Sequence, residues 1–134
     1  MTDTSSPKAN ILLVDDDKFL LDMYSMKFQQ QHYNVQACLS ARDALECLRH
    51  DFKPHVILFD LTMPECDGFT FLQTIRDEKL APNALKIALS NQSTDAEKEK
   101  IRSLGADQFI IKAMMIPSEV VNTVDVALST HKSA

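Results

Sequence analysis

The chain has 134 residues, of which 45% are hydrophobic and 25% are charged, a balance that is typical of a soluble globular protein. This length predicts one domain with a full hydrophobic core. The formal net charge of −5 argues against a nucleic-acid or anionic-membrane surface, because either would need a basic patch. We therefore expect neither nucleic acid nor a membrane among the partners.

The cysteines and the two ends of the chain indicate the compartment. The cysteines are odd in number and lack metal-ligand spacing, which predicts buried free thiols in a reducing environment; they are Cys38, Cys47 and Cys66. The first residues are polar, without the apolar core of a signal peptide, and no later apolar run approaches membrane-spanning length. We expect a cytoplasmic protein with a disordered leader at 1–9, a domain at 10–130 and a tail at 131–134.

Two continuous apolar runs, residues 11–14 and 56–59, each stop at carboxylates. Runs of this kind are typical of strands that are buried on both faces. Between them, helical spacing follows the first run, a short mixed edge strand is expected at 34–39, and a capping-box pattern at 40–43 begins a second helix. The first helix is expected to place one stripe along its length, formed by Leu20, Met23, Tyr24, Lys27 and Phe28.

The second half of the chain continues the alternation. A turn at 64–68 places Asp67 to cap a third helix, and an apolar strand at 85–89 stops at Ser90. A second capping box at 94–97 begins a mostly charged helix. This helix has few side chains to bury, and they are Ala96, Ile101 and Leu104. We therefore expect it to be among the least firmly packed elements and among those most free to move.

The last elements are a short strand and a final helix. Gly105 is placed as the C-cap of the charged helix, and the strand at 109–111 ends at Lys112. Pro117 suits the first turn of the final helix. Five strands that alternate with helices predict an α/β fold with one parallel sheet covered on both faces, because each parallel crossover needs a helix.

Charged and hydroxyl side chains follow four of the expected strands. Because the carboxyl ends of parallel strands share one edge of the sheet, we expect these side chains to converge; they are Asp15, Asp16, Asp60, Ser90 and Lys112. Three carboxylates and one ammonium leave a charge of −2, which one divalent cation would neutralise. Carboxylates a few ångströms apart repel by about 4 kcal/mol per pair at an effective dielectric constant of about 20. An all-oxygen site of this kind suits Mg²⁺.

Longer motifs surround these strand ends. They are Leu13-Val14-Asp15-Asp16, Phe59-Asp60 followed by Met63-Pro64 and Asp67-Gly68, Leu89-Ser90, and Gly105-Ala106-Asp107 leading to Phe109 and Lys112. Together they resemble the receiver domain of a two-component response regulator over residues 10–128. The resemblance implies a single doubly wound, flavodoxin-like (βα)5 domain with strand order 2-1-3-4-5 and a site at the switch point between strands one and three.

The resemblance also implies roles for the site residues. Asp60 would be the nucleophile that accepts a phosphoryl group. Asp16 and Asp60 would ligate Mg²⁺ directly together with the backbone carbonyl of Thr62, and Asp15 would act mainly through water. Lys112 would pair with the phosphoryl oxygens. Such a site fits phosphoryl transfer, which needs mainly positioning and charge neutralisation.

A two-state switch would carry the signal outward. The resemblance implies that Ser90, whose hydroxyl would donate to a phosphoryl oxygen, is coupled to Phe109. The implied partners are a histidine kinase or histidine phosphotransfer protein and a downstream protein target, which would bind the face formed by the last two helices and the strand between them. Few residues follow position 130, so we expect the signal to leave by protein contact. The oligomeric state stays open.

Three residues depart from the family pattern: Asn91 after Ser90, Phe109 where many members have tyrosine, and Ala113 where proline is usual. A cis bond before a non-proline residue costs about 2.5–4 kcal/mol, so we expect a trans Lys112–Ala113 peptide. The loop that follows, residues 114–116, would either expose a methionine-rich patch for a partner or cap the core.

Two alternatives come from other functional classes. Asp15 and its neighbours also fit the Asp-x-Asp motif of haloacid-dehalogenase-type phosphohydrolases, with Asp15 as nucleophile. That family needs a second acidic pair late in the chain, which is not visible, and it leaves Asp60 unexplained. The other alternative is a receiver-like interaction module that works without phosphorylation. Such modules usually lose one of the acids or the lysine, and this chain keeps them all. We therefore expect a phosphoacceptor that modifies its own Asp60, not a true enzyme.

Overall fold

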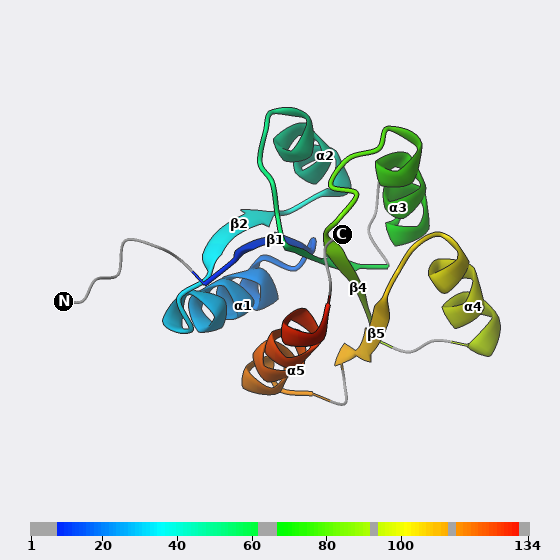
Figure 1. The fold of residues 1–134 in the computed structure, drawn as a ribbon. Helices are drawn as coiled ribbons and strands as arrows, with labels where there is room; N and C mark the ends of the chain where they lie inside the picture. The colour runs from blue at the N-terminus through cyan, green and yellow to red at the C-terminus, as the bar shows by residue number, and fades with distance from the viewer. Residues whose placement is uncertain (1–7, 62–66, 92–93, 113–114, 132–134) are drawn as a thin grey trace.

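The structure is a computed structural model that describes residues 8–61, 67–91, 94–112 and 115–131 (Figure 1). Strands and helices alternate along these residues, as the sequence predicts. The elements are β1 (Asn10–Val14), α1 (Lys18–Gln30), β2 (Asn34–Cys38), α2 (Ala41–Arg49), β3 (Val56–Asp60), α3 (Gly68–Asp77), β4 (Leu85–Ser90), α4 (Asp95–Ser103), β5 (Gln108–Ile111) and α5 (Pro117–Thr130).

The five strands form one parallel sheet in the order β2-β1-β3-β4-β5. Helices α1 and α5 lie on one face of the sheet, and α2 and α3 lie on the other (Figure 1). Helix α4 lies beside β5, on the same face as α2 and α3 (Figure 1). The predicted doubly wound α/β fold is therefore confirmed. None of the helices in the described part of the chain is long and apolar enough to cross a membrane.

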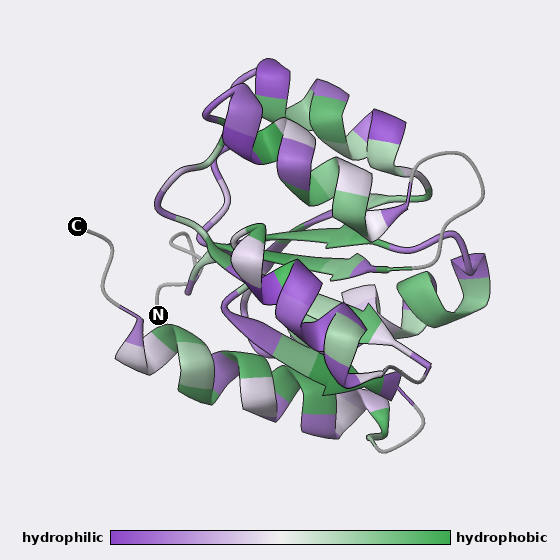
Figure 2. Ribbon diagram, turned by 90° about the vertical axis from the view of Figure 1, so that its right-hand side faces the viewer, coloured by the Kyte–Doolittle hydropathy of each residue, from purple (hydrophilic) through white to green (hydrophobic). Residues whose placement is uncertain are grey.

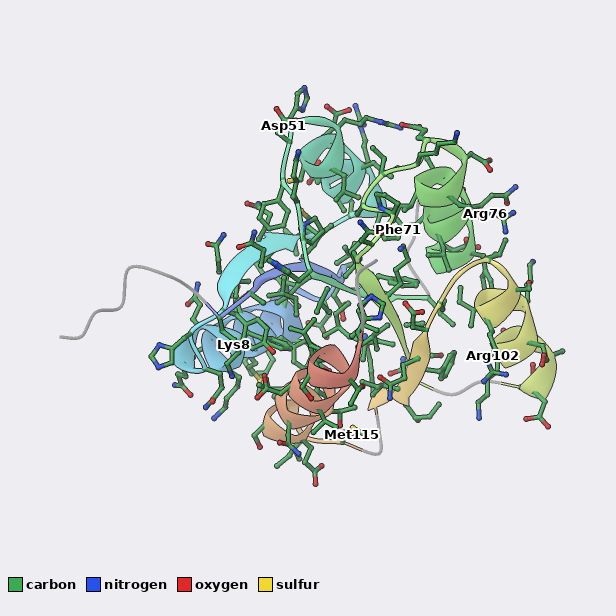
Figure 3. All side chains as sticks on the ribbon, in the orientation of Figure 1. Lys8, Asp51, Phe71, Arg76, Arg102 and Met115 are labelled. Carbon is green, nitrogen blue, oxygen red and sulfur yellow. The ribbon has the colours of Figure 1, made fainter. Side chains whose placement is uncertain are left out.

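Alternate residues of the strands feed two separate cores. In β1, Leu12 and Val14 pack under α2 and α3, whereas Ile11 and Leu13 pack under α1 and α5. Figure 2 shows the apolar strands between helices whose outer faces are polar. In Figure 3, Phe71 points from α3 toward the sheet, whereas the exposed side chain of Arg102 points away from α4. Burial on both faces explains why the strands read as continuous apolar runs.

Side chains cap four of the helices at their N-terminal ends. The oxygens of these side chains accept a backbone hydrogen bond from the residue three positions further on; the capping residues are Asp17, Ser40, Asp67 and Thr94. The caps predicted at Ser40, Asp67 and Thr94 are therefore confirmed, and Pro117 begins α5 as expected. Each cap satisfies a backbone donor that the helix itself cannot pair.

One burial prediction, in α4, is wrong, and α1 buries a stripe that its helical spacing alone did not specify. The buried residues of α1 are Leu21, Tyr24 and Phe28, while Leu20 and Met23 are only partly buried. In α4, Ala96 is exposed and Ile101 is the buried residue. Consecutive leucines at 20 and 21 left the rotation of α1 ambiguous, and α4 turns even its alanine to solvent because it meets the rest of the domain along a narrow stripe.

Candidate functional site

The strand register brings the predicted site residues to one edge of the sheet. Val14 in β1 lies opposite Phe59 in β3, so Asp15 and Asp60 are the next residues at adjoining strand ends. Ser90 pairs with Ile111 in β5, which places Lys112 directly after the last paired residue. The carboxyl ends of four neighbouring strands thus contribute side chains to this edge.

Three carboxylates meet there. Asp15 and Asp60 are buried, whereas Asp16 is exposed. One oxygen from each of the three lies within 4.8 Å of the others. Asp15 is held firmly: its Oδ1 accepts a hydrogen bond from the Asp17 amide at 3.0 Å, and its own amide donates to the Cys38 carbonyl at 3.1 Å.

Lys112 supplies positive charge between the two buried acids. Its Nζ lies 2.8 Å from Asp15 Oδ2 and 3.4 Å from Asp60 Oδ2, and its side chain is 11% exposed. Burial by itself lowers the pKa of Lys112, but the hydrogen bonds and charges of Asp15 and Asp60 outweigh burial and raise this pKa above the usual value. Lys112 is therefore a fixed cation at neutral pH.

The donor set fits a hard divalent cation. Carboxylate oxygens are the ligands that Mg²⁺ prefers, and this cation commonly keeps waters and leaves room for phosphate oxygens. With Lys112 counted, the three acids leave a charge of −2. The cluster borders an open hollow of about 530 Å³, which exceeds the volume of several water molecules at about 30 Å³ each.

Other residues that line this hollow were not assigned to it from the sequence. They are Asp17, Leu20, Tyr24, Asn91, Met115 and Pro117. Burial raises the pKa of the Tyr24 phenol, Lys112 lowers it, and Asp15 and Asp60 raise it, with a net increase. The phenol thus senses the charges of the site. The sequence signal that could have placed Tyr24 at the site is a tyrosine among aliphatic residues on a buried helix face, because its hydroxyl needs a polar neighbour.

The remaining predicted residues lie around the cluster. Ser90 is the buried last residue of β4. Phe109 is half-buried in β5 and packs against the α2–α3–α4 core, with Lys98 Nζ of α4 5.8 Å from its ring centroid. Thr62, Ala113 and the Lys112–Ala113 peptide fall outside the described residues. In the loop that follows, Met115 is partly buried against the core and Ile116 is 62% exposed.

Gly68 allows α3 to begin close behind the site. A Cβ atom at this position would lie 2.8 Å from Leu61 Cα and 2.9 Å from the carbonyl oxygen of Asp60. The Gly68 amide also donates to the Leu61 carbonyl at 2.9 Å. Only glycine fits this approach without displacing the backbone at the end of β3, and this steric need explains the Asp67-Gly68 pair.

Comparison with known proteins identifies the family. A family model described as the response regulator receiver domain matches residues 11–125. The chain belongs to this family. It is the receiver domain of a two-component response regulator, and receiver domains are signalling domains that typically bind Mg²⁺ through an acidic pocket.

Curated relatives are response regulators and regulatory proteins of different lengths. The regulatory protein VanR of Enterococcus faecium is 30% identical over 122 residues, which cover 91% of this chain and 51% of VanR. The two-component response regulator ORR3 of Oryza sativa subsp. indica is 28% identical over 114 residues, covering 85% of this chain and 86% of ORR3. The receiver domain thus spans about half the length of VanR and most of ORR3.

Solved structures show the same fold. A CheY-like receiver domain protein from Methanospirillum hungatei JF-1 superposes with a TM-score of 0.82 at 24% identity, covering 91% of this chain and 94% of that chain. The BeF3-activated DrrB receiver domain superposes with a TM-score of 0.77 at 28% identity, covering 90% and 97%. Both likenesses agree with the observed sheet order.

Proposed function

We propose that this receiver domain accepts a phosphoryl group on Asp60 and does so only with Mg²⁺. The observation that carries the proposal is the contact of Lys112 with both buried acids, at 2.8 and 3.4 Å, within a cluster that keeps a charge of −2. Excess acids around Lys112 favour binding of a divalent cation, and this cation together with Lys112 would then attract the anionic phosphoryl oxygens.

The residues fit a Mg²⁺ site built from carboxylate oxygens. Asp16 and Asp60 would hold the cation together with the Thr62 carbonyl, and Asp15 would act mainly through water. The bound cation would neutralise part of the charge on the acids and on the phosphoryl oxygens. This requirement for charge neutralisation is the reason that phosphorylation should fail after chelation.

The chain's own residues would perform the transfer. A carboxylate oxygen of Asp60 attacks the phosphorus of the donor, the new O–P bond forms, and the bond from phosphorus to the leaving atom of the donor breaks. Lys112 would pair with a phosphoryl oxygen, and Ser90 would donate its hydroxyl to another. Asp15 is the poorer nucleophile, because its Oδ1 accepts from the Asp17 amide and its Oδ2 lies against Lys112, which disfavours the phosphohydrolase alternative.

The output would leave through the side of the domain that holds α4. Movement of Ser90 toward the phosphoryl group would free space for Phe109, which lies under Lys98 of α4, and would so shift α4. The face formed by α4, β5 and α5 would then bind a downstream protein. The phosphoryl donor would be a histidine kinase or a histidine phosphotransfer protein in the cytoplasm, and slow autodephosphorylation would reset the switch.

Intact-mass measurement with acetyl phosphate tests the proposal. Wild-type chain with Mg²⁺ should gain a single phosphoryl group, and neither chelated chain nor Asp60→Asn should gain any. Asp17→Asn serves as a matched acid control, since the exposed Asp17 carboxylate caps α1 and lies outside the cluster of three carboxylates, and it should be labelled normally. Labelling that survives Asp60→Asn, or that ignores the chelator, contradicts the proposal.

A further inference from the structure

Two thiols meet between the sheet and α2, beside the acidic site. Cys38 ends β2 and Cys47 lies nine residues later in α2, and their Sγ atoms are 3.7 Å apart. Cys38 is buried and Cys47 is half-buried. Nothing in the phosphoryl-transfer chemistry uses this pair, and the sequence predicts only separate buried thiols.

The two sulfurs are in non-bonded contact, and closing a covalent bond between them needs a short further approach. An S–S bond measures about 2.05 Å, so the sulfurs must approach by about 1.7 Å from their separation of 3.7 Å. Cys38 is anchored, because β2 pairs with β1 along its whole length and its last residue lies opposite Val14. The two sulfurs would therefore approach through rotation of the side chains and a small shift of α2.

We propose that Cys38 and Cys47 form a covalent modification site, which closes into a reversible intramolecular disulfide by exchange with a small-molecule disulfide such as oxidised glutathione. The two cysteines lie in one chain and in one core, so closure needs no partner protein. Disulfides of this kind in reducing compartments are transient and respond to redox conditions.

The difference in exposure sets the order of the exchange. The half-buried Cys47 reacts first: its thiolate attacks one sulfur of the small disulfide, the S–S bond of that molecule breaks, and one small thiolate leaves. Cys38 then loses its proton to water, and its sulfur attacks Cys47 Sγ and releases the second small thiolate. Two protein thiols are oxidised and one small disulfide is reduced to two thiols, so electrons and atoms balance.

Proximity makes the second step feasible. Burial, with a further contribution from Cys47, raises the pKa of the Cys38 thiol to about 12, so Cys38 alone is a weak nucleophile toward molecules in solution. Held at 3.7 Å, it faces Cys47 at a high effective concentration. The new bond would adjoin the hydrogen bond from the Asp15 amide to the Cys38 carbonyl.

Thiol mapping on the full chain tests the proposal. After incubation with oxidised glutathione, wild-type chain should lose two hydrogens in intact mass and should yield a peptide that links Cys38 to Cys47, and reduction should reverse both changes. Cys66→Ser is the matched control and should close identically. Cys38→Ala should instead keep one glutathione on Cys47.

Three results would overturn the proposal. They are a stable glutathione adduct on Cys47 of the wild-type chain, a bond that involves Cys66 or a second copy of the chain, and thiols that stay reduced in native protein while the urea-unfolded chain reacts. None of these measurements depends on phosphorylation, so the two proposals fail separately.

Discussion

The two ends of the sheet use the same kinds of side chain in different ratios. At the amino end, the Asp125 carboxylate accepts from the Tyr33 hydroxyl at 2.6 Å and from Lys8 Nζ at 3.1 Å. One acid there has two donors. At the carboxyl end, three acids cluster, and Lys112 contacts two of them, Asp15 and Asp60. At the amino end, paired charges join segments that are far apart in sequence. At the carboxyl end, the excess negative charge could bind a cation.

Further hydrogen bonds join segments at the amino end. The backbone amide of Asn10 donates to His55 Nδ1 at 3.0 Å, and the Asn34 side chain donates to the Asn10 side chain at 3.1 Å. These contacts tie the starts of β1, β2 and β3 to one another. The amino end thus uses its polar contacts to join the strands, whereas the carboxyl end keeps excess acidic charge around Lys112.

Removal of Lys112 should give the largest effect. Lys112→Ala leaves two buried carboxylates without their cation, and loss of one partner of a buried ion pair costs about 3 kcal/mol or more. We expect the free energy of unfolding in urea to fall by about 3 kcal/mol without Mg²⁺ and to recover in part with Mg²⁺. We also expect phosphorylation, or the conformational change that follows it, to weaken.

Asp17→Ala is the control for the lysine variant. Asp17 accepts from the Leu20 amide as the N-cap of α1, so its loss should cost only about 1 kcal/mol and should leave phosphorylation close to wild type. A silent Lys112→Ala together with an inactive Asp17→Ala would reverse the assignment of the site cation.

Gly68→Ala tests how tightly the carboxyl end is packed. Alanine favours a helix by about 1 kcal/mol over glycine, but its Cβ would clash with backbone atoms of Leu61 and Asp60. Overpacking costs about 1–3 kcal/mol, so we expect thermal unfolding to show a net loss and Mg²⁺ affinity to fall. Gln73→Ala, on the exposed side of the same helix, should be nearly neutral. Equal effects of the two variants would disprove the steric argument.

Tyr33→Phe should weaken the amino end by about 1.5 kcal/mol, since it removes a hydrogen bond to a charged group. Burial, followed by the hydrogen bond and charge of Asp125, raises the pKa of Tyr33 above its usual value. The folded pKa then exceeds the unfolded pKa of about 10, so this stabilisation is full below about pH 10 and is lost as pH rises further. Urea unfolding of both proteins at neutral and alkaline pH checks this. A stability difference that persists unchanged at alkaline pH contradicts it.

The smallest effect is expected in α4, on the side of the domain that we propose for output. Lys98→Ala removes the cation–π contact to Phe109, worth about 0.5 kcal/mol. Because Ile101 is the buried residue of α4, amide exchange in α4 should already be faster than in the strands and should accelerate further in this variant. Glu99→Ala is the control. Uniform protection of α4 and the strands would count against a mobile α4.

Local patterns made most of the fold predictable. A strand that is buried on both faces is a continuous apolar run, so β1 and β3 were evident from residues 11–14 and 56–59. Parallel strands place all their carboxyl ends at one edge of the sheet, so the convergence of Asp15, Asp60 and Lys112 was predictable from the sequence. Caps depend on residues three apart, and these too were readable from the sequence.

Contacts between distant or ambiguous positions were not predictable. Lys8 and Asp125 are 117 residues apart, and nothing local links them. The meeting of Cys38 with Cys47 depends on how α2 folds back on β2, and the place of Tyr24 in the site depends on the rotation of α1. Single-sequence patterns carry periodicity, but they do not fix such rotations.

Locating the proposed phosphoryl group in the sequence is the most direct test of the proposed function. After reaction with acetyl phosphate and Mg²⁺, reduction with borohydride converts an aspartyl phosphate to homoserine, which peptide mass mapping locates. We expect homoserine at position 60 of the wild-type chain, and none there in a chelated sample or in Asp60→Asn. Homoserine at position 15, or an unmodified chain under conditions where native fold and Mg²⁺ binding are verified, would contradict it.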